Sequence, residues 1–316
     1  MQGTGNSRSA ALPAGDGGTE RDAAGAGRKL CAAKTPGMRR VARRATRARV
    51  LECAIVLLVA AVVTVPLEGV ANAQDVAPTQ EELAAITERG KRLYEYDQAA
   101  WHASDAVQVA NPKVVERQRC IATKEDGKWR VVFGKWSEDG TRFEITYEAN
   151  EQATPGEFAV RKEPDGRQDE GFFLHAARAI ELAMKDFGGA TRPYNVALLR
   201  ASAGRLFVYL YPAQTDARVH PLGGDVRYLV SGDGMSILEK RQMHKTIMEK
   251  SPSKQTKKAV AGYHTHILSD LPEDTDVFHV LTQDPPVPEK VATAHFLYQV
   301  KIDGTIQIEK TRKRKK

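Results

Sequence analysis

The stretch "DVRYLVSGDGMSILEKRQMH", residues 225–244, decides the fold class. Two runs that contain β-branched and aromatic residues flank the turn Gly232-Asp233-Gly234. Asp and Gly tolerate the positive φ of a tight turn, so the stretch predicts a β-hairpin. Similar turns occur at "KEDGK" (124–128), at "SEDGT" (137–141) and at Asp303-Gly304. Successive hairpins predict antiparallel meanders rather than parallel strands joined by crossover helices.

Two segments show the apolar spacing of helices. The first, residues 80–107, is preceded by Thr79, which with Glu82 has the spacing of a capping box. This helix is either continuous or broken into two pieces at Gly90, because glycine costs about 1 kcal/mol in a helix interior. The second segment, residues 172–187, ends at a Gly-Gly pair. The fold class is therefore α+β, a mostly antiparallel sheet with two main helices.

Strands are expected at residues 116–123, 128–136 and 142–148, which are joined by Asp-Gly turns. In the third of them Phe143, Ile145 and Tyr147 alternate with charged or polar residues, as in a sheet with one solvated face. Residues 150–170 are polar and contain two prolines, which predicts a surface loop or a weak domain boundary. The body of the protein, residues 74–309, is thus either one unit or two units divided near that loop.

The N-terminal region has the pattern of a secretory signal at residues 38–73: arginines, the apolar run Ala54–Val65, and the site Ala71-Asn72-Ala73. As a helix the run would span about 18 Å, short of the roughly 30 Å hydrocarbon core, which favours cleavage over an uncleaved anchor. Residues 1–37 are interpreted as disordered or as an extension upstream of the true start. We therefore expect a periplasmic or secreted protein.

Charge and cysteine content change when the leader is set aside. Residues 1–73 hold 11 of the 47 Lys+Arg and 5 of the 40 Asp+Glu. The rest of the chain therefore has 36 basic and 35 acidic residues, a net charge of +1. Six basic residues lie in the tail 310–316, which could contact an anionic envelope surface, or could simply be a solvated end. No nucleic-acid partner is expected for the body. Cys120 alone remains after the leader, which excludes an intramolecular disulfide.

A second stretch, "AGYHTHILSDLPEDTD" (261–276), holds the candidate site residues. On a strand, His264 and His266 project from the same face, and two imidazoles can bind one zinc ion. Asp276 and His279 follow in the adjacent acidic segment and complete the predicted metal set. The sequence favours a second interpretation over metal binding: a structured turn without metal, in which the histidines hydrogen-bond the acidic loop and Asp274 or Thr275 caps a short helix.

Residues 262–276 resemble the motif of the JAMM (MPN+/JAB) metalloproteases. In that family a strand ends in Gly-aromatic-His-x-His, and a loop leads to Ser-x-x-Asp at the start of a helix. The resemblance implies zinc bound by His264, His266 and Asp276, with an upstream glutamate, Glu239 or Glu249, that activates water. The sequence has Ile267 where the family usually has proline, and it has no Ser-x-x-Asp.

Over residues 80–309 the chain also resembles uncharacterised exported proteins of Gram-negative bacteria, a resemblance that implies no activity. No catalytic set, dinucleotide fingerprint or phosphate loop can be assigned, so no cofactor is expected unless the histidine stretch binds zinc. The sequence therefore predicts an exported protein with a structural or binding role, and a JAMM-like zinc-dependent hydrolase is the alternative. It does not decide whether the protein is an enzyme.

Overall fold

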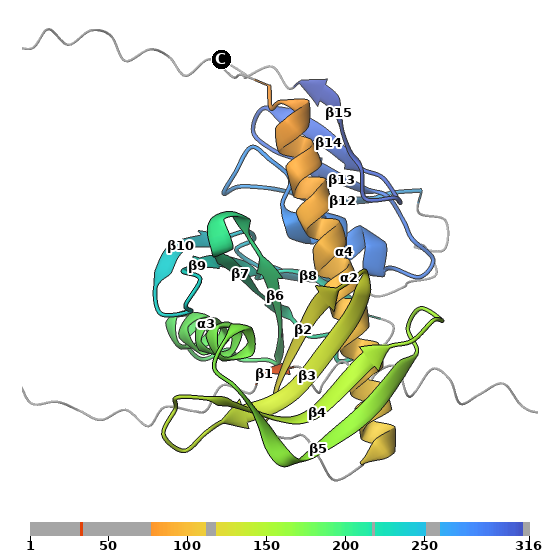
Figure 1. Ribbon diagram of the computed structural model, residues 1–316. Helices are drawn as coiled ribbons and strands as arrows, with labels where there is room; N and C mark the ends of the chain where they lie inside the picture. The colour runs from red at the N-terminus through yellow and green to blue at the C-terminus, as the bar shows by residue number, and fades with distance from the viewer. Residues whose placement is uncertain (1–31, 34–76, 112–117, 217–218, 251–259, 312–316) are drawn as a thin grey trace, which may run out of the picture.

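A computed structural model describes residues 32–33, 77–111, 118–216, 219–250 and 260–311 (Figure 1). In these residues the chain forms α-helices and mostly antiparallel sheets, which confirms the α+β class. Its α-helices are α2 (Gln80–Ala110), α3 (Phe172–Phe187) and α4 (Asp274–Thr282). No helix in these ranges is both long enough and apolar enough to cross a membrane. The predicted signal segment and residues 312–316 of the basic tail lie outside the described residues.

The first sheet is an antiparallel meander of four strands in chain order. Its strands are β2 (Arg119–Glu125), β3 (Lys128–Trp136), β4 (Phe143–Glu151) and β5 (Phe158–Asp169). The prediction of a loop at 150–170 is wrong, because β5 occupies most of it. A strand is tolerated there because β5 lies at the sheet edge, and Pro164 falls between the paired residues Lys162 and Arg167.

The central sheet has the order β1-β6-β7-β9-β10, and the predicted hairpin 225–244 forms its β9 and β10. The pair β8–β11 lies beside it as a separate two-stranded sheet. The strands of the central sheet are β1 (Ala32–Ala33), β6 (Tyr194–Arg200), β7 (Leu206–Pro212), β9 (Val226–Val230) and β10 (Ile237–Gln242). The two-stranded sheet consists of β8 (His220–Gly223) and β11 (Ile247–Lys250). A short 3-10 turn, η1 (Ser202–Gly204), joins β6 to β7.

The C-terminal sheet contains one parallel pair, which the sequence did not predict. Its strands, in spatial order, are β12 (Gly262–Thr265), β13 (Glu289–Ala292), β14 (Phe296–Val300) and β15 (Ile306–Thr311). Strands β12 and β13 run parallel because α4 lies between them in the chain and returns it to the same end of the sheet. The first turn of α4 therefore follows closely on the carboxyl end of β12.

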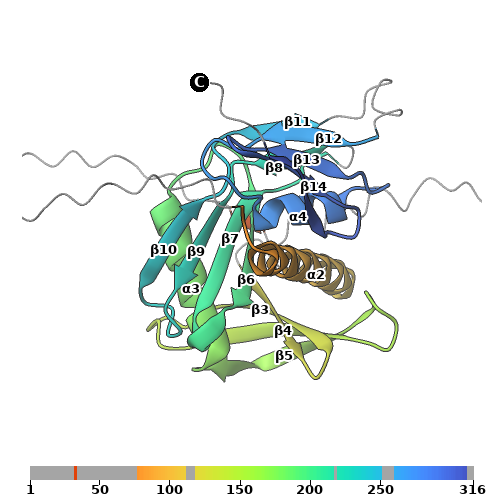
Figure 2. The same cartoon turned by 90° about the horizontal axis from the view of Figure 1, so that it is seen from above.

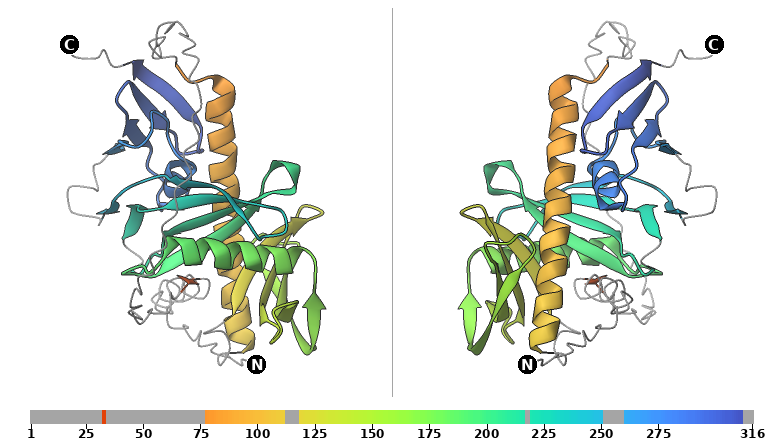
Figure 3. Two further views of the ribbon diagram at one scale, coloured as in Figure 1. Left: turned by 90° about the vertical axis from the view of Figure 1, so that its left-hand side faces the viewer. Right: turned by 90° about the vertical axis from the view of Figure 1, so that its right-hand side faces the viewer.

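Helix α2 runs along the length of the molecule as a single helix, from the C-terminal sheet to the β2–β5 sheet (Figure 3). Seen from above, it passes between α4 and the β2–β5 sheet (Figure 2). Its apolar residues contribute to two cores: Leu83 and Ile86 pack with α4 and the C-terminal sheet, and Leu93 packs with β2–β4 and the central sheet. The helix thereby joins the parts of the body.

Gly90 does not break α2, which is one continuous helix. A Cβ at this position would lie 2.4 Å from Val277 Cβ and 2.6 Å from the carbonyl oxygen of Asp274, both in α4. Both distances are far shorter than van der Waals contact, so glycine permits α2 and α4 to approach this closely. The packing gained against α4 outweighs the helix-propensity cost.

We predict that Gly90→Ala lowers the free energy of unfolding. Alanine favours the helix by about 1 kcal/mol, but overpacking against a backbone oxygen typically costs about 1–3 kcal/mol, so destabilisation is expected. Urea denaturation measures the change. Gly189→Ala is the matched control, because nothing lies within 4 Å of a Cβ there and the backbone has no positive φ. A Gly90→Ala variant as stable as Gly189→Ala would contradict the close α2–α4 contact.

Candidate metal centre

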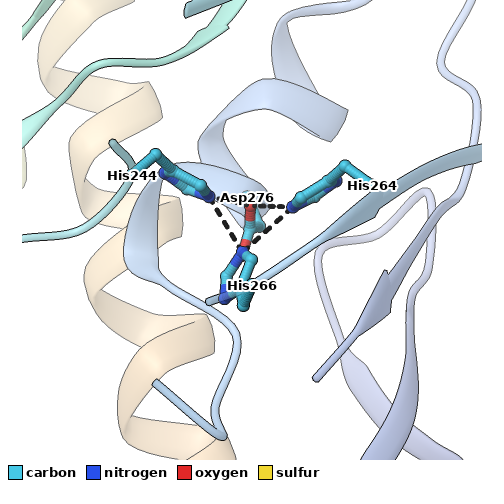
Figure 4. A group of neighbouring side chains, drawn as sticks. All are labelled: His244, His264, His266 and Asp276. Atoms are coloured by element: carbon cyan, nitrogen blue, oxygen red, sulfur yellow. Dashed lines mark hydrogen bonds and ion pairs between the residues drawn. The ribbon is translucent and has the colours of Figure 1, made fainter. Parts of the chain in front are cut away.

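Four side chains from three parts of the chain converge on one point (Figure 4). His244 lies in the connection between β10 and β11, His264 lies on β12, and His266 directly follows that strand. Asp276 lies in the first turn of α4. All four residues are buried, whereas Tyr263, which alternates with the histidines on β12, is 57% exposed. The two-residue period of the strand thus directs both histidines inward.

The atoms that meet are the Nε2 atoms of the three imidazoles and the carboxylate oxygens of Asp276. His266 Nε2 lies 2.9 Å from His244 Nε2 and 3.0 Å from His264 Nε2. Asp276 Oδ1 lies 3.1 Å from His244 Nε2 and 3.0 Å from His264 Nε2, and Oδ2 lies 3.2 Å from His266 Nε2. Ligands around a tetrahedral zinc ion with bonds of 2.0–2.1 Å are about 3.3 Å apart, so these separations are a few tenths of an ångström shorter.

The other ring nitrogen of each histidine has an acceptor of its own. His244 Nδ1 lies 2.8 Å from Asp225 Oδ1, and His264 Nδ1 lies 2.9 Å from Glu289 Oε1. His266 Nδ1 lies 2.8 Å from the carbonyl oxygen of Leu271. Because the partner of each Nδ1 is a carbonyl or carboxylate oxygen, which accepts the hydrogen bond, each Nδ1 is the donor and carries the proton. Such acceptors behind metal-binding histidines fix the tautomer and the orientation of the ring.

This arrangement leaves the centre rich in lone pairs. In a neutral imidazole with its proton on Nδ1, Nε2 presents a lone pair, and the Asp276 carboxylate also only accepts. Lone pairs aimed at one another across about 3 Å repel, and a cation between them turns that repulsion into attraction. The cation can be a metal ion, or protons can take its place on the imidazoles.

The electrostatics of the cluster favour positive charge. Burial alone would lower the pKa of His264, but Asp276 and Glu289 more than offset it and raise this pKa to about 8. The pKa of His244 is likewise raised well above its ordinary value, where Asp225 and Asp276 outweigh burial. Burial opposes ionisation of Asp276, yet His266, His244 and His264 hold its pKa well below the usual range. The carboxylate is therefore charged at neutral pH.

Three of the four predicted metal residues, His264, His266 and Asp276, belong to this cluster. His279 does not: it is buried one helical turn beyond Asp276 in α4, which carries it away from the convergence point. His244 was not predicted as a ligand, although the grouping of five of the eight histidines after residue 240 was a signal for it. The helix cap also differs, since Glu273 rather than Asp274 or Thr275 takes the N-cap position.

We predict that Asp225→Asn weakens zinc binding about tenfold, since partners behind metal ligands typically contribute 10–100-fold in affinity. Asparagine keeps the size and an acceptor but removes the charge that makes the imidazole of His244 a better ligand. Competition with a chromogenic chelator measures the affinity. Asp186→Asn is the control, because that carboxylate accepts from Tyr228 and Lys240 instead. Equal affinities in the two variants would refute a role for Asp225 at the centre.

Comparison of the chain with known protein families, curated proteins and solved structures finds no match. No family is therefore assigned to the protein.

Proposed function

We propose that the protein binds one zinc ion between His244, His264, His266 and Asp276, and that the ion has a structural or binding role. One observation carries this proposal: three imidazole Nε2 atoms and a carboxylate meet in a buried position while each Nδ1 already has an acceptor. Local hydrogen bonding of the histidines to an acidic loop, the interpretation that the sequence favours, does not require three rings to share one carboxylate.

The donor set favours zinc over other common ions. Calcium and magnesium are bound mainly by oxygen ligands, six or more for calcium, whereas three of these four donors are nitrogen. Copper(I) prefers the sulfur of Cys and Met, which the cluster lacks. Zinc accepts imidazole and carboxylate together and takes four ligands in tetrahedral geometry. Iron, nickel and copper(II) also accept imidazole, so metal analysis has to include them.

Four protein donors point to a closed site rather than a hydrolytic one. Catalytic zinc keeps a position open for water, whereas structural zinc is enclosed by four protein ligands. His244 supplies the fourth donor here. The glutamates considered as general bases have other partners: Glu239 lies 3.9 Å from Arg227, and Glu249 lies 2.5 Å from Arg192. We therefore favour a closed centre over JAMM-like hydrolysis.

The positions of the ligands suggest what the ion does for the protein. His244 follows the central sheet, whereas His264, His266 and Asp276 belong to the β12–α4 unit of the C-terminal sheet. An ion held by all four would cross-link these two regions. Export of the protein remains a proposal that rests on the leader-like residues 38–73 alone, as envelope contact rests on the basic tail.

We predict that protein purified without a histidine tag and reconstituted with zinc holds about one equivalent of metal by elemental analysis. A His244→Ala/His266→Ala variant should hold almost none, because two of four donors are gone. A His102→Ala/His175→Ala variant is the matched control, since both residues lie outside the cluster. Less than about 0.1 equivalent of any transition metal in the reconstituted wild type would overturn the proposal.

We also predict that zinc raises the melting temperature. A ligand that binds the folded state at about 100 times its Kd stabilises it by about 2.7 kcal/mol. The increase should be lost on addition of a chelator and should be missing in His244→Ala/His266→Ala. Calorimetry with and without zinc measures both effects. A wild-type melting temperature that does not respond to zinc would contradict a cross-linking ion.

A further inference from the structure

The N-terminus of α4 carries three carboxylates in four positions: Glu273 at the cap, then Asp274 and Asp276. The positive end of a helix dipole favours such groups, but buried carboxylates this close also repel one another. Each has its own partner. The guanidinium of Arg241 donates to both oxygens of Glu273 at 2.9 and 2.7 Å, whereas Asp276 faces the histidines.

Asp274 has the densest set of partners, and they come from three elements. Arg89 of α2 donates from Nε to Asp274 Oδ1 at 2.9 Å, and its Nη2 also lies 2.9 Å from that oxygen. Arg227 of β9 donates to Oδ2 at 2.6 Å, and the hydroxyl of Tyr209 on β7 donates to Oδ2 at 2.8 Å. The Asp274 side chain is 1% exposed. Charge-assisted hydrogen bonds to guanidinium groups are strong and directional, so they fix the position of this carboxylate.

Asp274 and Asp276 lie on opposite sides of the same helical turn. Residues two apart in an α-helix are separated by about 200° around its axis. Asp274 therefore contacts α2 and the central sheet while Asp276 reaches the histidines, as their partners show. The contact of Gly90 with the Asp274 carbonyl brings α2 against this same turn. If the contacts of Asp274 were lost and the first turn of α4 shifted, the Asp276 carboxylate would move with it.

We propose that Arg89 and Arg227 are positioning residues of the metal centre. By holding Asp274 they fix the first turn of α4 at the place from which Asp276 reaches the ion. Metal affinity then depends on α2, a helix that contributes no ligand. This role rests on the proposed zinc centre. It adds that the ion pairs of Asp274 with Arg89 and Arg227, on the far side of α4 from the histidines, hold the ligand Asp276 in place.

The test compares two arginines on the same helix. Arg89→Met removes one guanidinium from Asp274, while Arg227 and Tyr209 remain as partners, so the carboxylate is not left alone. Arg92→Met is the matched control, because Arg92 donates to the carbonyl oxygen of Arg200 and not to α4. We expect zinc affinity, measured by chelator competition, to fall about tenfold in Arg89→Met and less than about twofold in Arg92→Met.

Arg89→Lys and a cobalt spectrum separate positioning from a general loss of stability. Lysine keeps the charge but not the planar fork, so its zinc affinity should lie between those of wild type and Arg89→Met. In Co(II)-substituted protein, the visible absorption of tetrahedral Co(II) should change in Arg89→Met and not in Arg92→Met. Zinc affinity within about twofold of wild type together with an unchanged spectrum in Arg89→Met would overturn the inference.

A metal-free measurement tests whether Arg89 holds the first turn of α4, independently of zinc binding. Hydrogen exchange of the α4 amides should be faster in Arg89→Met than in Arg92→Met, because the helix turn is held less firmly. If the wild type binds no metal, the zinc centre is refuted, and the role of Arg89 in the metal centre is refuted with it, whatever the exchange shows. If the wild type binds zinc but neither the affinity nor the Co(II) spectrum responds to Arg89→Met, the positioning role alone is refuted.

Discussion

A completely buried carboxylate, Asp276, is the constraint around which the C-terminal part of the protein is arranged. An uncompensated charge in a protein interior costs several kcal/mol, so a buried carboxylate needs both hydrogen bonds and opposite charge. The backbone N–H of Glu273 donates to Asp276 Oδ2 at 2.7 Å, and the three imidazoles surround the carboxylate on its other sides. Strand β12, helix α4 and the β10–β11 connection all have to meet at this point for the charge to be matched.

The cluster also shows how the protein keeps neighbouring acids separate. Arginines compensate Glu273 and Asp274, and histidines face Asp276. Arginine stays protonated and cannot present a lone pair to a metal, whereas a histidine can bind either a proton or an ion. The choice of cationic partner thus divides three nearby carboxylates into two that anchor α4 and one that faces the centre. The carboxylates of Asp225 and Glu289, behind two of the rings, add to the attraction for positive charge.

Local sequence patterns predicted much of the fold. The capping box at Thr79, the helix at 172–187 and the Asp-Gly hairpins are present, because each depends on residues close together in the chain. The features that these patterns missed or left open have a common cause. Residues 158–169 form a strand because β4 offers a partner for pairing, and Gly90 stays helical because α4 packs against it. The parallel β12–β13 pair follows from the path of α4, which no local pattern specifies.

At the candidate site, too, local sequence patterns predicted some features, and contacts between distant segments decided the others. The sequence alone determined that His264 and His266 share one face, because alternation along a strand is a property of the backbone, and it placed Asp276 nearby in the chain. Only the tertiary structure decided that His244 joins them and that His279 does not, and only it brought Asp225 and Glu289 behind the rings. Those positions depend on strand order, on the close approach of α2 to α4 and on the crossover through α4. These are contacts between distant segments, whose energies are set by packing and charge compensation rather than by residue spacing.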